Sequence, residues 1–237
     1  MTPVATVQRL GVIDSGETAV RVLNAVGGLN DAGDAPPITT VLFHDEPDPQ
    51  PWYSREADEI KPLCENVEQR SIDDVVACLR AADVDTLWLG SWPGEERAGL
   101  IGACAAAGIG VVGPNADTVR RLSDPAQLPA IGDRAALLDG RPLRRVEVDI
   151  LADDHGTVWN LGGRDVSVRR SHHSLVAEAP CAAVSDELAT AICAAASDLA
   201  RDVGYRGAGM VTFVHDLSLI HISEPTRPRL ESRMPSY

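Results

Sequence analysis

The stretch from Arg144 to Pro180 constrains the fold of this chain most, because it predicts two strands joined by a tight turn. Apolar and acidic side chains alternate from Val146 to Ile150, which is the period of a half-buried strand. The residues at 153–156, Asp-Asp-His-Gly, have the chemistry of a hairpin turn. Residues 158–161 then predict the returning strand. We therefore expect an antiparallel pair of strands here.

A basic loop follows the second predicted strand. Three arginines and two histidines occur between Arg164 and His173, in a chain whose formal net charge is -14. The planar fork of an arginine fits two oxygens of a phosphate or carboxylate at once. The alternative is a solvated loop whose arginines pair with nearby acids, which is the more common outcome for basic clusters.

The same stretch resembles the biotin carboxylases, a family of ATP-grasp ligases. The matching residues are Arg144, Val146, Glu147, Asp153, Gly156, Leu161, Arg164, Asp165, Ser167, Arg170, His172, Glu178 and Pro180. The resemblance implies ATP and Mg²⁺ as cofactors, activation of bicarbonate by ATP, and carboxylation of biotin on a carrier. The candidates that it suggests for an ATP cleft are Arg145, Arg169, Arg170 and His172. We assign no catalytic residue and no metal ligand.

Strands and helices alternate in the first half of the chain. Strands are expected at residues 7–13, 38–43, 86–89 and 109–112, and helices at 16–23, 72–82 and 95–107. Ser15 is placed to cap the first helix. Repeated strand-helix units of this length predict a parallel, Rossmann-like sheet. A free Rossmann-like ligand-binding module is disfavoured, because no G-x-G-x-x-G or phosphate-binding loop follows the first strand.

This half also resembles the amino-terminal domain of the biotin carboxylases. The family's A-N-R-G-E-I-A-x-R corresponds to residues 13–21, where Asp14-Ser15 replaces Asn-Arg, and its G-P segment corresponds to residues 113–120. The fold class that we expect is therefore α/β, with a Rossmann-like domain followed by a partial ATP-grasp domain of the α+β class. The expected parts are the first domain at 1–114, a shortened connection replacing the lid at 115–142, the ATP-grasp core at 143–216, and a tail at 217–237.

One more helix and strand are expected before that tail. Ser185 is placed to cap the helix, and Gly204 to end it. One apolar stripe on this helix consists of Leu188, Ile192, Ala195 and Leu199. A strand at 210–214 follows. The tail fits no continuation of the family and resembles a translated sequencing adapter, so we expect it to be non-native.

Departures from the family pattern concern the cations and the metal site. The family's phosphate-contacting lysine corresponds to Pro125, and its metal-binding glutamate in Y-x-G-A-G-T-x-E-F corresponds to Thr212. The glutamine and lysine of Q-R-R-x-Q-K are Arg169 and Ser174, and Lys61 is the only lysine in the chain. Phosphoryl transfer depends on cations around the migrating charge. We therefore expect no biotin-dependent ATP hydrolysis by this chain.

Two functional hypotheses follow. The first is a fragment of a biotin carboxylase from an acetyl-CoA or propionyl-CoA carboxylase system. Its partners by resemblance are the biotin carboxyl carrier and carboxyltransferase components. The second is a non-catalytic carboxylase-like protein that serves assembly or weak nucleotide binding. Both hypotheses are compatible with a homo-oligomer.

Composition narrows the class of protein. The negative net charge argues against nucleic acid or an anionic membrane as a partner. Apolar runs are too short to span a membrane, the first ten residues lack a signal-peptide pattern, and the cysteines have no close pair. We expect a cytoplasmic protein with reduced thiols and no zinc site.

Two further clusters are weaker candidates. His155, with the neighbouring pair His172 and His173, suggests a metal site, but adjacent histidines rarely converge and no carboxylate spacing supports them. Trp88 and Trp92 suggest stacking on a ligand, although large aromatic side chains more often pack against a core.

Overall fold

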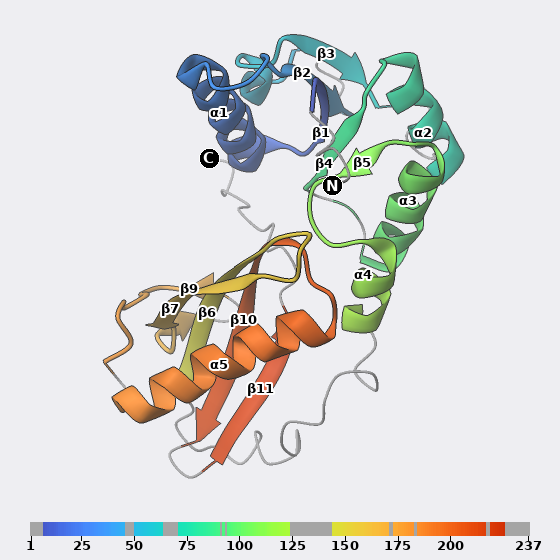
Figure 1. Cartoon of the computed structure of the whole chain (residues 1–237). Coiled ribbons are helices and arrows are strands. Elements are labelled where there is room, and N and C mark those ends of the chain that lie inside the picture. Colours follow the sequence, from blue (N-terminus) through green and yellow to red (C-terminus); the bar gives the residue numbers. More distant parts are fainter. Residues whose placement is uncertain are drawn as a thin grey trace. The chain divides into compact units, whose positions relative to one another are not determined.

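The computed structural model describes residues 7–45, 50–63, 71–90, 92, 94–123, 144–170, 173–182, 184–216 and 219–225. The chain divides into two compact units, one covering Met1–Val112 and the other Gly113–Arg227 (Figure 1). No helix among the described residues is long and apolar enough to cross a membrane.

The first unit contains a five-stranded parallel sheet with the order β3-β2-β1-β4-β5. Its strands are β1 (Arg9–Ile13), β2 (Thr39–His44), β3 (Glu59–Pro62), β4 (Thr86–Leu89) and β5 (Gly110–Val111). Chain order reverses between β1 and β4, as in doubly wound α/β folds. The prediction of a parallel, Rossmann-like sheet is confirmed.

The helices of this unit begin within one residue of the predicted positions, and the first extends well beyond the predicted range of 16–23. They are α1 (Gly16–Ala32), α2 (Ile72–Ala81) and α3 (Gly94–Ala106), with a short 3₁₀ turn, η1 (Trp52–Ser54). Leu23 of α1 packs against Val12 and Leu42 in one apolar cluster. Ser15 stands at the N-cap position of α1, but the prediction that its side chain caps the helix is wrong. Its backbone N–H instead donates to the Asp14 carboxylate at 2.9 Å.

The second unit contains an antiparallel four-stranded sheet with the order β11-β10-β6-β7. Its strands are β6 (Arg144–Ala152), β7 (Val158–Asp165), β10 (Gly207–Asp216) and β11 (Leu219–Pro225). Strands β6 and β7 form the expected hairpin. Two short strands, β8 (Arg169–Arg170) and β9 (His173–Ser174), pair separately.

Two helices belong to this unit, α4 (Ala116–Ser123) and α5 (Asp186–Asp202). Helix α4 lies in the range that we expect to be a shortened connection, and residues 124–142 of that range are outside the described residues. Strand β11 lies in the range that we expect to be a non-native tail, and it pairs with β10. The origin of the tail and the limits of the connection stay predictions.

Helix α5 covers one face of the antiparallel sheet (Figure 1). The prediction that Ser185 caps it is confirmed, because the hydroxyl accepts a hydrogen bond from the backbone N–H of Leu188 at 3.3 Å. The core between helix and sheet consists mainly of Val146, Val148, Ile150, Ile192, Leu199, Val211 and Phe213. Since side chains alternate along a strand, the intervening residues of β6 and β10 lie on the opposite face.

The motif at 205–209 forms the turn between α5 and β10, and close packing in this turn explains Tyr205, Gly207 and Gly209. Gly207 has a φ of +92°, and a Cβ there would lie 3.0 Å from the Cα of Gly113. A Cβ on Gly209 would lie 2.7 Å from the ring of Tyr205, whose hydroxyl donates to the carbonyl of Ala208. Backbone packing therefore accounts for these residues without a ligand.

Candidate functional site

The face of the sheet opposite α5 carries charged side chains in its middle. Along β6 the residues on this face are Arg145, Glu147 and Asp149, which alternate with the core valines. Glu147 is buried although it is an acid. A buried carboxylate requires a compensating partner, because removing its charge from water is costly.

Arg164 of β7 is that partner. Its guanidinium lies 3.3 Å from Glu147 Oε2 and 2.7 Å from Asp149 Oδ2. It also contacts the Sδ atom of Met210 at 3.0 Å. The Glu147 side chain is 10% exposed and that of Arg164 35%. One arginine thus pairs with two carboxylates, which leaves one negative charge in excess in this cluster.

Thr212 of β10 completes a row of three residues across the sheet. It lies opposite Glu147 on β6, and Glu147 lies opposite Arg164 on β7. Thr212 is buried, and its neighbour on the same face of β10 is Met210. A neutral hydroxyl is a poor ligand for a hard cation compared with a carboxylate.

Arg145 stands at the end of this face. Its backbone N–H donates to Ser167 Oγ at 2.9 Å, and its carbonyl accepts from the N–H of Val166 at 2.8 Å. These bonds fix the strand at this point. Within the described part of the chain, the half-buried side chain of Arg145 makes no ion pair.

Asp165 joins β7 to the loop that follows. It accepts a hydrogen bond from the Ser167 N–H at 2.7 Å and lies 3.0 Å from Arg144. Its backbone exchanges two hydrogen bonds with Glu178. Burial raises the pKa of Asp165, but the hydrogen bonds of Ser167 and the pairing with Arg144 outweigh it, so the pKa is lowered below 3.8.

The basic loop forms the β8-β9 hairpin. Arg169 lies opposite Ser174, and Arg170 lies opposite His173. Arg170 is exposed, whereas Arg169 is half-buried and has an interaction partner. His172 is outside the described residues. The structure therefore places Arg169 and Arg170 side by side on one small sheet and Arg145 on another.

Sequence reasoning recognised Arg164 as part of the basic cluster but missed its two acidic partners. The signal was present, since Glu147 and Asp149 alternate with buried valines and so share one face. Only the register between β6 and β7 brings Arg164 to them. For this arginine, the alternative of pairing with nearby acids is correct.

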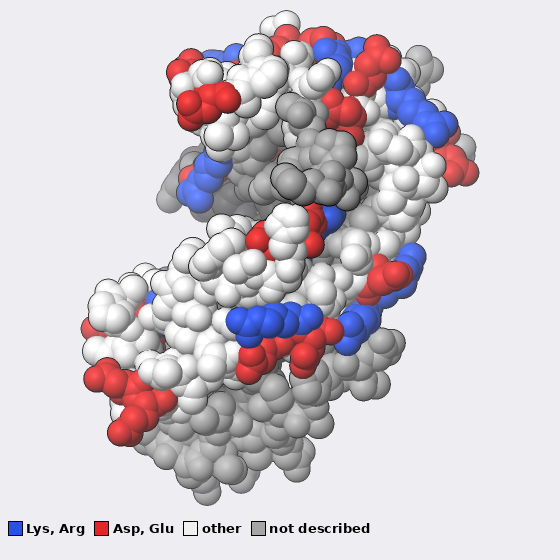
Figure 2. Space-filling view, viewed as in Figure 1, with Lys and Arg blue, Asp and Glu red and all other residues white. Residues whose placement is uncertain are grey.

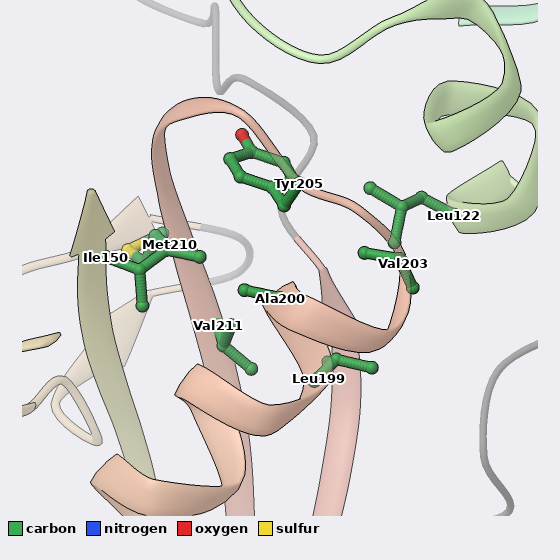
Figure 3. Close-up of a pocket in the computed structure, with 8 residues that line it drawn as sticks. All are labelled: Leu122, Ile150, Leu199, Ala200, Val203, Tyr205, Met210 and Val211. Atoms are coloured by element: carbon green, nitrogen blue, oxygen red, sulfur yellow. The ribbon is translucent and has the colours of Figure 1, made fainter. Parts of the chain in front are cut away.

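The apolar pocket in Figure 3 lies on the other side of the same sheet. Leu122 of α4 and Leu199 of α5 face Ile150 and Val211 across it, and Tyr205 stands at one end. The volume that the centre of a water molecule can occupy in this pocket is about 10 Å³. This is roughly the minimum needed to hold one water. The pocket is a packing defect of the core.

The remaining candidates do not form a site among the described residues. His155 is exposed in the β6-β7 turn, and no group of three or more His, Cys, Asp or Glu there is arranged to hold a metal. Trp88 packs against the α1 cluster and donates to Asp14 at 3.4 Å. Burial raises the pKa of the Cys104 thiol to about 11, so it is not a nucleophile at neutral pH.

Charges on the outer side of α4 and α5 are mixed. Ion pairs join Arg120 to Asp117 on α4 and Arg201 to Asp198 on α5. Figure 2 shows basic and acidic side chains next to one another over these helices. This surface therefore has no single sign of charge that would attract a polyanion.

Two family models match the sequence. "Biotin carboxylase, N-terminal domain" matches residues 6–119, and "Carbamoyl-phosphate synthase L chain, ATP binding domain" matches residues 103–230. Together they span both units.

Several curated relatives are similar. Human mitochondrial pyruvate carboxylase is 24% identical over 301 positions, covering 95% of this chain and 25% of the relative. Biotin carboxylase 1 of Bacillus subtilis is 22% identical, covering 89% of the chain and 62% of the relative. Biotin carboxylase 2 of that organism is 42% identical over 73 residues, 31% of the chain and 16% of the relative. The chain thus spans about a quarter of the pyruvate carboxylases and under two thirds of biotin carboxylase 1.

Solved structures agree in fold. A complete multifunctional pyruvate carboxylase from Rhizobium etli superposes with a TM-score of 0.79 at 26% identity, over 97% of this chain and 25% of that one. A biotin carboxylase complex from Campylobacter jejuni gives a TM-score of 0.76 at 18% identity, over 96% and 66%. The human alignment covers more positions than the 237 residues of this chain, so the relative has extra residues inside the matched region. If the connection at 115–142 is shortened in this chain, we expect the relatives to have extra residues of this kind.

Proposed function

Since this chain belongs to the biotin carboxylase family of ATP-grasp proteins, we propose that it is a carboxylase-like domain that binds a nucleotide weakly and does not turn it over. The observation that carries this proposal is the row of Thr212, Glu147 and Arg164. It lies on the sheet face where the family resemblance puts the metal-binding glutamate.

Mg²⁺ does not fit the residues of this row. The ion requires oxygen ligands, with carboxylates supplying the charge. Glu147 is already paired with Arg164, and Thr212 offers only a hydroxyl. The described residues contain no group of three His, Cys, Asp or Glu arranged for a metal. We therefore derive no phosphoryl-transfer step through a metal at this position.

Cationic support for phosphoryl transfer is also reduced in the chain. Positioning and electrostatic stabilisation supply most of the catalysis of this reaction. Pro125 stands where the resemblance puts a phosphate-contacting lysine, and the family's glutamine and lysine are replaced by the paired residues Arg169 and Ser174. Arg145 and Arg170 remain as cations for an anion, without the lysines of the family pattern.

Partners follow from the same family relationship. The Rhizobium etli relative is a multifunctional pyruvate carboxylase, and another similar solved structure is the biotin carboxylase subunit of a pyruvate carboxylase. We propose that the partners of this chain are a biotin carboxyl carrier and a carboxyltransferase component, with ATP as the nucleotide.

The test of this proposal is equilibrium binding of a fluorescent ATP analogue to the purified chain, followed by displacement with ATP. We expect saturable binding in the micromolar to millimolar range, displaced by ATP and not by adenosine. No saturable binding under any salt or metal condition would contradict the proposal.

A further inference from the structure

We infer that the outer edge of β7, the edge that faces away from β6, pairs with the same edge of a second copy of this chain. This inference does not depend on the proposed function. Strand β7 is the last strand of its sheet, so no strand of that sheet lies along its outer edge (Figure 1). An open edge presents backbone N–H and C=O groups that can pair with another strand.

One half of this edge is already continued by an antiparallel segment of the same chain. Asp165 exchanges two backbone hydrogen bonds with Glu178 at 2.9 Å, and the Gly163 carbonyl accepts from the N–H of Cys181 at 3.1 Å. Within the described part of the chain, residues 158–161 have no such bonds on their outer side. The edge therefore accepts antiparallel partners, and a new one can occupy its first half.

The alternation of the backbone shows which groups of this first half face outward. The Thr157 carbonyl accepts from the N–H of Asp153 across the hairpin, so Thr157 bonds toward β6. Because alternate residues of an antiparallel strand bond to opposite sides, Val158 and Asn160 direct their N–H and C=O groups away from β6. Two-fold pairing through these groups places Val158 opposite Asn160 of the second copy. Trp159 then lies opposite the same tryptophan of the second copy.

Apolar side chains are exposed along this half of the edge. Trp159 is 48% exposed and Leu161 69%, and Leu151 of β6 lies opposite Trp159 on the open face of the sheet. Residues that face each other in a non-hydrogen-bonded antiparallel pair have Cα atoms about 4.5 Å apart, close enough for two indole rings to touch. Aromatic pairs of this kind stabilise a sheet. Pairing thus buries apolar surface that the single chain exposes.

The distribution of charge favours a second copy as the partner. The net charge of -14 opposes self-association wherever charged surfaces meet. Residues 156–163 contain no charged side chain, although 24% of the chain is charged. Self-pairing through this run therefore places no like charges opposite each other. A two-fold axis requires a surface that fits itself, and an uncharged antiparallel edge meets that requirement.

Sedimentation velocity of the full chain at increasing concentration, without nucleotide, tests the inference. We expect a reversible equilibrium between monomer and dimer, because pairing uses up the open edge of both copies and ends at two. A chain that stays monomeric at the highest concentration would overturn the inference. Continuous growth into larger species would also overturn it.

A matched pair of variants tests the position of the interface. Trp159→Lys removes the aromatic pair and places two like charges opposite each other, so it should weaken dimerisation about tenfold or more. Trp52→Lys makes the same change in η1, where Trp52 is 63% exposed, and should leave dimerisation unchanged. Circular dichroism checks that both variants fold. Equal dimerisation of the two folded variants would overturn the assignment to β7.

A mixture of Trp159→Lys and Trp159→Glu tests the pairing of this tryptophan with itself. Each variant alone should dimerise poorly, because it brings like charges together. The mixture should form a heterodimer, because the unlike charges then face each other across the two strands. Sedimentation with a fluorescent label on one variant measures it. A mixture that associates no better than either variant alone would overturn this register.

Discussion

Thr212 on β10 lies directly opposite Glu147 on β6, and Glu147 is ion-paired with Arg164 at 3.3 Å. A position that the family resemblance gives to a metal-binding glutamate thus carries a neutral hydroxyl. The acid beside it is already neutralised from the neighbouring strand. The chain keeps the fold of an ATP-grasp sheet, while the acid in this row is paired with an arginine of the same sheet.

Removing Arg164 should destabilise the second unit. Arg164→Met leaves Glu147 buried without a counter-charge, and we expect a loss of about 3 kcal/mol in the free energy of unfolding. Urea denaturation followed by circular dichroism measures it. Arg201→Met on the exposed surface of α5 is the control and should change stability by less than about 0.5 kcal/mol. Equal losses of stability in the two variants would contradict the conclusion that Arg164 stabilises the buried Glu147.

Asp165 should contribute stability that depends on pH. Its pKa is lowered in the folded state, so the contribution is present above the unfolded pKa and is lost as pH falls through the folded value. Asp165→Asn should therefore be less stable than the parent at pH 7, and the difference should shrink below about pH 4. Thermal melts across pH measure this. The exposed control Asp34→Asn should change stability by less than about 0.5 kcal/mol at pH 7. A pH-independent difference for Asp165→Asn would rule out the linkage.

Gly209 should not tolerate a side chain. A Cβ there would lie 2.7 Å from the ring of Tyr205, so Gly209→Ala should destabilise the protein by about 1–3 kcal/mol. A methyl group added at Gly28 in α1 would meet open space, and Gly28→Ala should stabilise the helix by up to about 1 kcal/mol. Chemical denaturation of both variants gives the comparison. A neutral Gly209→Ala would show that Tyr205 moves freely.

The alternation of strands and helices could be predicted because most elements contain a clear apolar run, such as that of Thr86–Leu89. Strand β3 escaped prediction since Glu59–Pro62 contains a single apolar aliphatic residue, Ile60, and forms the edge of its sheet. Helix α4 was missed because its range was assigned to a connection. Short polar elements of this kind depend on their neighbours in space.

The candidate site was predictable in part. Arg145 could be placed on a strand from the alternation that begins beside it, and its lack of an ion partner among the described residues appears only in three dimensions. Arg164 looked available in the sequence because its partners Glu147 and Asp149 are at least fifteen positions away. Cross-strand register decides which arginine is committed and which is available.

ADP release by the purified chain in the presence of ATP, Mg²⁺, bicarbonate and free biotin tests the central claim most directly. A coupled spectrophotometric assay follows it, with a fully active biotin carboxylase as the positive control. The row of Thr212, Glu147 and Arg164 predicts no ADP above the protein-free rate, even at nucleotide concentrations that saturate binding. Bicarbonate-stimulated ADP release that rises in proportion to the chain's concentration would contradict the account.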